Sequence, residues 1–201
     1  MSKTGMLYVY SGPSGVGKGT ILGPYLKAHD NAVLSVSATT RAPRPGETEG
    51  VEYHFLGTKQ FEALIANCGL LEYAQYSGNY YGTPRAEVEK HLMEGLDVFL
   101  EIEVQGAMKI KKTFPDAVFI FVLPPSFEVL RRRLTNRGTE PPAVVEMRLN
   151  TAREEMRHAM EYDYVIINDN VEKARAELSC IVTAAKCQTK NMKKLIQKVS
   201  D

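Results

Sequence analysis

Short apolar runs recur along the chain and alternate with longer segments whose apolar residues have helical spacing. The runs of strand length are Met6–Tyr10, Val98–Glu103, Ala117–Leu123 and Tyr164–Ile167. The segments that predict helices include Lys18–His29, Arg85–Glu94, Ser126–Thr135 and Ala143–Glu161. Continuously apolar strands separated by helices are typical of a parallel sheet with helices packed on its faces. The pattern therefore predicts an α/β fold.

Between Ser35 and Thr83 this alternation stops. The segment has short strand-like pieces at Tyr53–Leu56 and Leu71–Tyr76, a helix-like piece at Thr58–Asn67, and loops rich in Pro, Gly, Thr and Tyr. With 201 residues, of which 44% are hydrophobic, the chain is long enough for one core that carries a small subdomain. We therefore predict that this segment is an inserted subdomain.

Two features that follow the insert bear on the organisation of the rest of the chain. Pro141 and Pro142 mark a break between two predicted helices, because proline cannot continue a helix. The segment from about Lys186 to Lys198 carries five lysines on a helical pattern with three apolar residues. This basic terminal helix is either a solvated helix face or a contact between copies of the chain, so a homo-oligomer stays open.

The net charge and the cysteines argue against several classes of protein. A formal net charge of +1 does not favour a nucleic-acid backbone or an anionic membrane as the main partner. The three cysteines have no CxxC spacing, which indicates ordinary reduced thiols. The first residues lack the apolar core of a signal peptide, and no stretch reaches the ~20 apolar residues of a membrane span. We expect a cytoplasmic protein that binds neither nucleic acid nor a membrane.

A glycine-rich segment joins the first predicted strand to the first predicted helix. It reads SGPSGVGKGT, and its candidate ATP-binding positions are Gly12, Pro13, Ser14, Gly15, Val16, Gly17, Lys18, Gly19 and Thr20. A strand, a glycine loop and a helix in this order are the context of a P-loop, whose backbone N–H groups curl round a phosphate at the positive end of the helix. In that arrangement Lys18 reaches the β- and γ-phosphates.

One position departs from the usual P-loop pattern, GxxxxGK[ST]. Gly19 stands where the magnesium-binding hydroxyl usually falls, and Thr20 follows one residue later. The ending GKGT is similar to that of nucleoside monophosphate kinases. We expect Thr20 to contact a phosphate. The direct ligands of Mg²⁺ stay unknown, with Thr20 and Glu103 as the candidates, directly or through water.

Spaced motifs elsewhere point to the phosphate acceptor. The insert contains SVSATTRAPRPGE, then GVEYHF, then EYAQYSGNYYGTP, and EIEVQG, RGTE and NDN follow later. Together with the P-loop, these motifs resemble the guanylate kinase family in order and over nearly the whole chain. The resemblance implies a P-loop three-layer α/β fold with a central parallel sheet, an inserted GMP-binding subdomain and a short lid. The core would comprise residues 1–34, 84–136 and 149–201, the subdomain 35–83 and the lid 137–148, all within one domain.

The resemblance also implies where GMP binds. The family's pattern gives the phosphate to Arg41, Arg44, Tyr53 and Tyr81, and guanine to Ser37, Glu72 and Thr83, with Gly82 beside them. Two arginines three residues apart form a fork that suits a dianionic phosphate. A carboxylate at Glu72 accepts from N1–H and N2–H₂ of guanine, whereas adenine presents a lone pair there. Base choice would therefore rest on this carboxylate.

The ends of two predicted strands and the lid add further candidates. Glu101 and Glu103 close the predicted strand Val98–Glu103 on one face, and the carboxyl ends of parallel strands are where such sheets bind ligands. By resemblance, these two approach the GMP base and the magnesium region, and Asn168 and Asp169 meet the adenine edge. The family's lid pattern favours Arg137 and Arg148 as the pair that closes on ATP, with Arg133 as a weaker third.

The predicted reaction is direct in-line transfer of the γ-phosphoryl group from ATP, the co-substrate, to GMP, with Mg²⁺ as cofactor. The catalytic residues would be Lys18, Arg41, Arg137 and Arg148. No general base is needed, because the GMP phosphate is already an anionic nucleophile. Two alternatives stay open. One is a kinase for another nucleotide, and the other is a binding module of the same fold that has lost ATP binding and recognises phosphorylated peptides.

Overall fold

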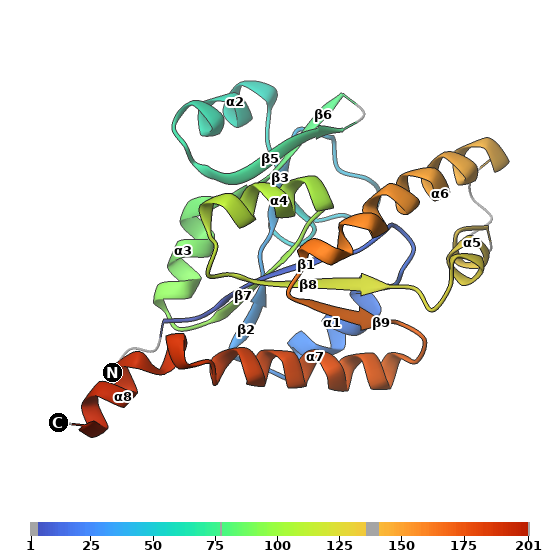
Figure 1. Cartoon of the computed structure of the whole chain (residues 1–201). Coiled ribbons are helices and arrows are strands. Elements are labelled where there is room, and N and C mark those ends of the chain that lie inside the picture. The colour runs from blue at the N-terminus through green and yellow to red at the C-terminus, as the bar shows by residue number, and fades with distance from the viewer. Residues whose placement is uncertain (1–3, 77, 136–140, 201) are drawn as a thin grey trace. The chain divides into compact units, whose positions relative to one another are not determined.

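A computed structural model describes residues 4–76, 78–135 and 141–200 (Figure 1). The chain divides into two compact units, which are treated separately below. The first comprises Met1–Tyr10 and Asp30–Ala117, and the second comprises Ser11–His29 and Val118–Asp201. The main sheet has the strand order β2-β7-β1-β8-β9. Its strands are β1 (Leu7–Ser11), β2 (Ala32–Leu34), β7 (Asp97–Glu101), β8 (Val118–Leu123) and β9 (Tyr164–Ile167). The predicted parallel α/β fold is confirmed.

In the first unit, β1 and β2 both pair in parallel with β7. The side chains of β1 are buried along its whole length, as a continuously apolar strand requires. The strand β7 ends at Glu101, so the predicted strand Val98–Glu103 was two residues too long. Glu103 instead occupies the N-cap position of the helix α4 (Val104–Thr113). The expectation that Glu101 and Glu103 share one strand face was therefore wrong, because the alternation of a strand stops at Glu101.

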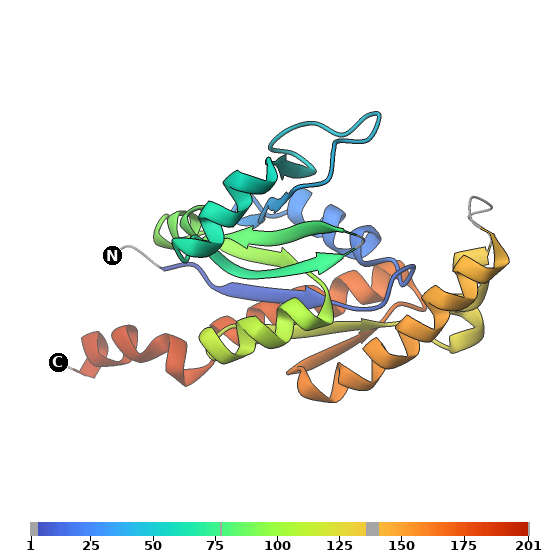
Figure 2. The ribbon, with the colours of Figure 1, turned by 90° about the horizontal axis from the view of Figure 1, so that it is seen from above.

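A second sheet in the same unit has the order β4-β3-β6-β5. Its strands are β3 (Ser37–Thr39), β4 (Tyr53–Phe55), β5 (Leu70–Tyr76) and β6 (Asn79–Pro84). The helix α2 (Thr58–Ala66) packs on one face through Phe61, which lies with Ala38 and Leu70 in a small core. Figure 2 shows β5 and β6 as a curved antiparallel pair. The sequence pattern indicated β4, α2 and β5 but missed β3 and β6, whose residues are not apolar runs.

The second unit is helical apart from β8 and β9. Its helices are α1 (Lys18–Lys27), α5 (Phe127–Thr135), α6 (Pro142–Arg157), the short 3₁₀-helix η1 (His158–Glu161) and α7 (Val171–Lys186). Helix α6 begins at Pro142, where proline is tolerated because the first N–H of a helix has no partner within it. Leu130 and Leu134 of α5 pack against Val145 and Leu149 of α6 in a buried cluster.

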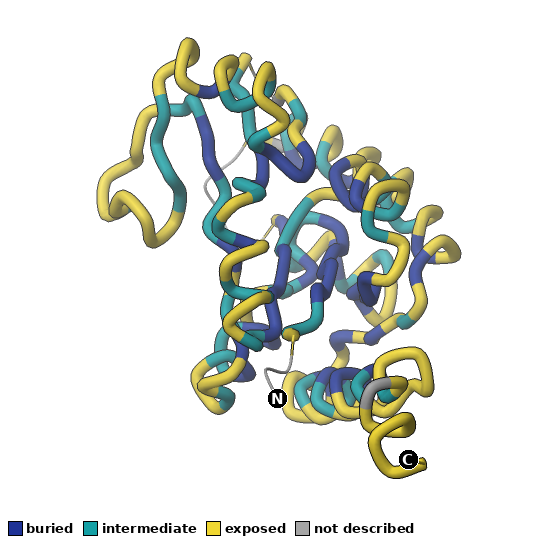
Figure 3. Tube along the Cα trace, turned by 90° about the vertical axis from the view of Figure 1, so that its left-hand side faces the viewer, coloured by how far each residue is buried: buried dark blue, intermediate teal, exposed yellow. Residues whose placement is uncertain are grey.

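The last helix, α8 (Thr189–Ser200), replaces the predicted helix from Lys186 to Lys198, because α7 continues as far as Lys186. Figure 3 shows this end of the chain as almost wholly exposed, and Leu195 and Val199 are among its exposed apolar residues. In the residues that the structure describes, no helix has the length and apolar content to cross a membrane. The thiols of Cys68, Cys180 and Cys187 are exposed.

Candidate functional site

The glycine-rich loop of the second unit has no room for side chains at three positions. Gly15 and Gly17 have φ angles of 81° and 91°, in the left-handed region that favours glycine. A β-carbon at Gly15 would lie 2.6 Å from Cδ2 of Leu134. One at Gly12 would lie 2.5 Å from the carbonyl oxygen of Val122. The loop therefore packs closely against β8 and α5, and only glycine at these positions allows its curled conformation.

Lys18 lies at the first position of α1 and bends back over this loop. Its Nζ donates to the carbonyl oxygen of Gly12 at 2.7 Å. Gly17 caps the helix in a left-handed conformation, and Thr20 Oγ1 donates to the carbonyl oxygen of Gly17 at 2.6 Å. The loop thus presents a cation and the N-terminus of α1 on one side, which is the arrangement that binds phosphate.

Asn168 follows β9 and contacts the loop although the two are far apart in the sequence. It is buried, and its Nδ2 donates to the carbonyl oxygen of Val16 at 2.8 Å. Its Oδ1 is buried without a hydrogen-bond partner among the described residues. A β-carbon at Gly17 would lie 2.6 Å from Asn168 Nδ2, so a glycine is required here for the contact. Asp169, by contrast, is exposed, and its carboxylate accepts from its neighbour Asn170.

Arg133 of α5 contacts the same group of atoms. Its guanidinium donates to the carbonyl oxygen of Val16 at 3.0 Å and to that of Asn168 at 2.8 Å. Arg133 ranked below the two lid arginines in the sequence analysis, because the family's lid pattern favours Arg137 and Arg148. It is one of three adjacent arginines on a helix, Arg131, Arg132 and Arg133. The structure separates them, since Arg131 pairs with Glu146 on the surface and Arg132 is exposed.

Of the two lid arginines predicted from the sequence, one lies in the described residues. Arg148 of α6 donates from Nη2 to Ser14 Oγ at 2.8 Å, which brings it to the glycine loop. Arg137 and the rest of the first third of the predicted lid, residues 137–140, lie outside the described residues. Arg153 of α6 lies over the ring of Phe127 at 4.2 Å and has a packing role.

The acceptor candidates of the first unit share the face of the second sheet that faces away from α2. Ser37 is in register with Tyr53, Thr39 is in register with Tyr81, and side chains two residues apart share a face. Ser37, Tyr53, Tyr81 and Thr83 therefore lie on one face. Their neighbour Gly82 turns to the other face, where a β-carbon would lie 3.0 Å from the ring of Phe61.

Arg41 and Arg44 lie in the loop after β3 and share one carboxylate. Arg41 donates to both carboxylate oxygens of Glu47 at 2.9 Å, and the backbone N–H of Arg44 donates to the same group at 2.7 Å. The hydrogen bonds from Arg41 hold the pKa of Glu47 below its usual value. Arg41 also lies over the ring of Tyr53 at 5.4 Å. The guanidinium of Arg41 is thus oriented by a bidentate ion pair and an aromatic ring, whereas Arg44 contributes its backbone N–H to the same carboxylate.

Glu72 of β5 is a buried carboxylate in the same unit, with only 8% of its surface exposed. Thr83 Oγ1 donates to Glu72 Oε1 at 2.8 Å. Burial raises the pKa of Glu72, while the bond from Thr83 and the charge of Lys109 oppose the rise and the charge of Glu103 adds to it. A buried carboxylate with an incomplete set of partners is suited to accept further N–H donors from a ligand.

The remaining strand-end candidates occupy different positions. Glu101 ends β7 beside Tyr10, whose pKa is raised by burial and by the charge of Glu101. Glu103 is exposed at the start of α4, where its charge acts on Glu72. Among residues 4–76, 78–135 and 141–200, no group of three or more His, Cys, Asp or Glu side chains is placed to hold a metal ion.

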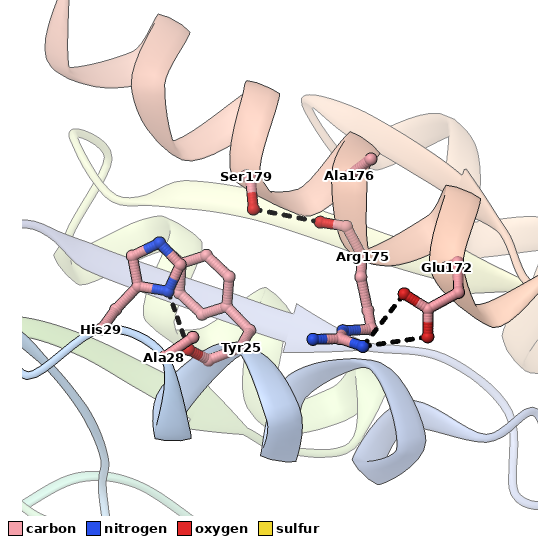
Figure 4. A pocket seen from close by; sticks show the side chains of 7 residues that line it. All are labelled: Tyr25, Ala28, His29, Glu172, Arg175, Ala176 and Ser179. Atoms are coloured by element: carbon pink, nitrogen blue, oxygen red, sulfur yellow. Dashed lines mark hydrogen bonds and ion pairs between the residues drawn. The ribbon is translucent and has the colours of Figure 1, made fainter.

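A surface pocket of about 230 Å³ lies elsewhere in the second unit, between α1 and α7 (Figure 4). It adjoins Tyr25 and His29, at the end of α1 remote from Lys18. Its polar side chains already bind one another or the backbone, since Arg175 pairs with Glu172 and His29 bonds to the carbonyl of Tyr25. The pocket therefore has no evident share in the phosphate chemistry.

The parallel sheet and the glycine loop before α1 define the class of protein: a P-loop phosphate-binding α/β protein. The family model described as guanylate kinase matches residues 4–185. A guanylate kinase of Clostridium perfringens is 49% identical over 189 residues, which cover 94% of this chain and 88% of that protein. A guanylate kinase of Halalkalibacterium halodurans is 50% identical over 188 residues, which cover 94% of this chain and 92% of that protein. The chain belongs to the guanylate kinase family.

Solved structures share the fold of this chain. The crystal structure of guanylate kinase from Anaplasma phagocytophilum has a TM-score of 0.75 and 37% identity, covering 93% of this chain and 89% of that one. A gluconokinase from Sinorhizobium meliloti has a TM-score of 0.50 at 17% identity, which shows a shared fold alone.

His54 of β4 lies between two carboxylates. One is Glu49, which precedes that strand, and the other is Glu87 of the helix α3 (Arg85–Met93), so His54 links the second sheet to this helix. Its Nδ1 lies 3.0 Å from Glu49, and its Nε2 lies 3.1 Å from Glu87. Glu49 also accepts from the backbone N–H of Phe55 at 2.7 Å. Glu87 in turn lies 3.8 Å from His91. Partial burial lowers the pKa of His54, but the bonds to the two carboxylates outweigh it and the pKa is raised.

We expect this link to stabilise the fold more at low pH. A group whose pKa is raised on folding contributes its full stability below its unfolded pKa, about 6.5 for histidine, and loses it as pH rises through the folded pKa. Urea unfolding of the wild type and of His54→Gln should therefore show a larger stability difference at about pH 6 than at about pH 8.5. Glu87→Gln should reproduce the trend. A difference that grows with pH would contradict the link.

Proposed function

We propose that this chain transfers the γ-phosphoryl group of ATP to GMP, giving ADP and GDP. Its membership in the guanylate kinase family over residues 4–185 carries the proposal. The relatives named guanylate kinase, about half identical over nearly their whole length, support it further. ATP and GMP are then its small-molecule partners, and the cytoplasm expected from the sequence is part of the proposal. Self-association stays open.

The glycine loop of the second unit is the proposed ATP half. Its backbone and Lys18 would hold the β- and γ-phosphates, and Arg148 and Arg137 would stabilise the charge that spreads over the transferring oxygens. The contact of Arg148 with Ser14 supports this role for Arg148. Asn168 and Asp169 are the proposed contacts of adenine. The buried, unpartnered Oδ1 of Asn168 supports that role, because it leaves an acceptor for the 6-amino group.

The second sheet of the first unit is the proposed GMP half. Arg41, Arg44, Tyr53 and Tyr81 would bind the phosphate, and the pairing of Arg41 with Glu47 supports an oriented fork that exchanges one anion for another. Ser37, Glu72, Gly82 and Thr83 would bind guanine, with Glu101 and Glu103 nearby. The phosphate of GMP attacks directly, so no side chain needs to remove a proton.

Mg²⁺ is proposed to arrive with ATP. It is usually held by substrate phosphates, waters and one or two carboxylates rather than by a closed protein cage. The described residues fit that mode, since Thr20 Oγ1 bonds to Gly17 and no carboxylate cluster lies ready for a metal among them. When bound, Mg²⁺ would neutralise charge on the β- and γ-phosphates. Thr20 and Glu103 stay the proposed neighbours of the ion, directly or through water.

Lys18→Ala tests the ATP half. We expect kcat to fall by roughly 10²- to 10³-fold or more, because the main cation on the transferring phosphates is lost. GMP binding, measured by calorimetry, should change little. The matched control is Lys27→Ala, which removes an exposed lysine from the last turn of the same helix. Unchanged turnover in Lys18→Ala would rule out the mechanism proposed here.

Glu72→Gln tests the GMP half. The amide keeps the shape of the side chain but replaces one acceptor with a donor, which opposes the N–H groups of guanine. We expect kcat/KM for GMP to fall by roughly 10²-fold or more, since hydrogen bonds to a charged group are among the strongest. The KM for ATP should stay near the wild-type value. Glu62→Gln, at an exposed position of α2, is the control. Equal losses for both substrates would show that Glu72 does not contact the base.

A further inference from the structure

Gly106 lies in the first turn of α4 at a buried position. It is not among the residues with positive φ, so its backbone does not require glycine. Glycine is also a poor residue for a helix. A β-carbon at Gly106 would meet three atoms of one residue, Glu72: Oε2 at 2.7 Å, Cδ at 3.0 Å and Cγ at 3.5 Å. The space left by the missing side chain is the space in which the Glu72 carboxylate lies.

Two further contacts fix the carboxylate against α4. Thr83 of β6 donates a hydrogen bond from Oγ1 to Glu72 Oε1, and the other oxygen, Oε2, lies next to Gly106. Lys109, one turn further along α4, donates from Nζ to the carbonyl oxygen of Tyr73, the residue after Glu72. Lys109 also lies 5.1 Å from the ring of Tyr73. Lys109 therefore holds the helix α4 against the strand β5 next to the carboxylate, at the place where the two elements lie side by side in Figure 1.

We propose that Gly106 is a specificity-determining position for the acceptor base, because its lack of a side chain sets where the Glu72 carboxylate lies. Gly106 is a positioning residue, since it acts only through Glu72. This inference rests on the proposed function, in which Glu72 accepts from N1–H and N2–H₂ of guanine. A methyl group at position 106 would displace Oε2 of Glu72, while the hydrogen bond from Thr83 would still hold Oε1 in place. The carboxylate would then address the two donors of guanine at the wrong angle and distance.

The test compares Gly106→Ala with Gly23→Ala. Gly23 is a helical glycine of α1 with no described atom within 4 Å of its β-carbon position, so this control makes the same chemical change without a collision. kcat/KM is measured for GMP and for IMP, which lacks the 2-amino group, and KM is measured for ATP. Far-UV circular dichroism checks folding.

We expect Gly106→Ala to lower kcat/KM for GMP by roughly tenfold or more, the equivalent of one weakened bond to a charged group. The preference for GMP over IMP should fall, and the KM for ATP should stay unchanged. Gly23→Ala should match the wild type in all three. A folded Gly106→Ala variant with the wild-type ratio of GMP to IMP use would overturn the inference. A wild type that does not phosphorylate GMP would instead overturn the proposed function.

The double variant Glu72→Asp, Gly106→Ala covers the case in which Gly106→Ala alone does not fold. Aspartate is one methylene shorter and withdraws the carboxylate from the new methyl group. The added effect of Gly106→Ala should therefore be smaller in the Glu72→Asp background than in the wild type, or folding should return. Equal effects in both backgrounds, or a double variant that also fails to fold, would show that something other than Glu72 limits the space at position 106.

Discussion

Close packing against glycine shapes the candidate residues of each unit, because neighbouring atoms occupy the space that a β-carbon would fill. In the glycine loop, Gly12 packs against the backbone of β8 and Gly15 against Leu134, so the loop can curl only with glycine at these positions. In the first unit, the absence of a side chain at Gly106 leaves room for the carboxylate of Glu72. Such contacts hold the glycine loop and the Glu72 carboxylate in one arrangement before a ligand arrives, which is how preorganised sites gain specificity.

Around the loop, one carbonyl oxygen links several parts of the second unit. Val16 accepts from Asn168, which follows β9, and from Arg133 of α5. Arg148 of α6 reaches Ser14 two residues earlier. A change in α5 or after β9 would therefore act on the phosphate loop through these hydrogen bonds, in addition to any direct contact with a ligand. These links explain why the loop, although short, depends on residues more than one hundred positions away.

The local patterns were predictable and the long-range ones were not. The glycine loop and the strand before it could be recognised because the signal lies within ten consecutive residues. Glu103 was misplaced, since an apolar run does not show where a strand gives way to a helix cap. The contact between Gly106 and Glu72 left no local signal, because the two residues are far apart in the sequence. Arg133 could be separated from its neighbours only by the direction in which each side chain leaves α5.

The most direct measurement is a coupled assay of ADP formation with Mg·ATP and equal concentrations of GMP, AMP, UMP or CMP. We expect turnover with GMP and rejection of the other three by roughly 10⁴-fold in kcat/KM, because only guanine offers two adjacent N–H donors to a buried carboxylate. Turnover of AMP or UMP at a rate comparable to that of GMP would contradict this expectation.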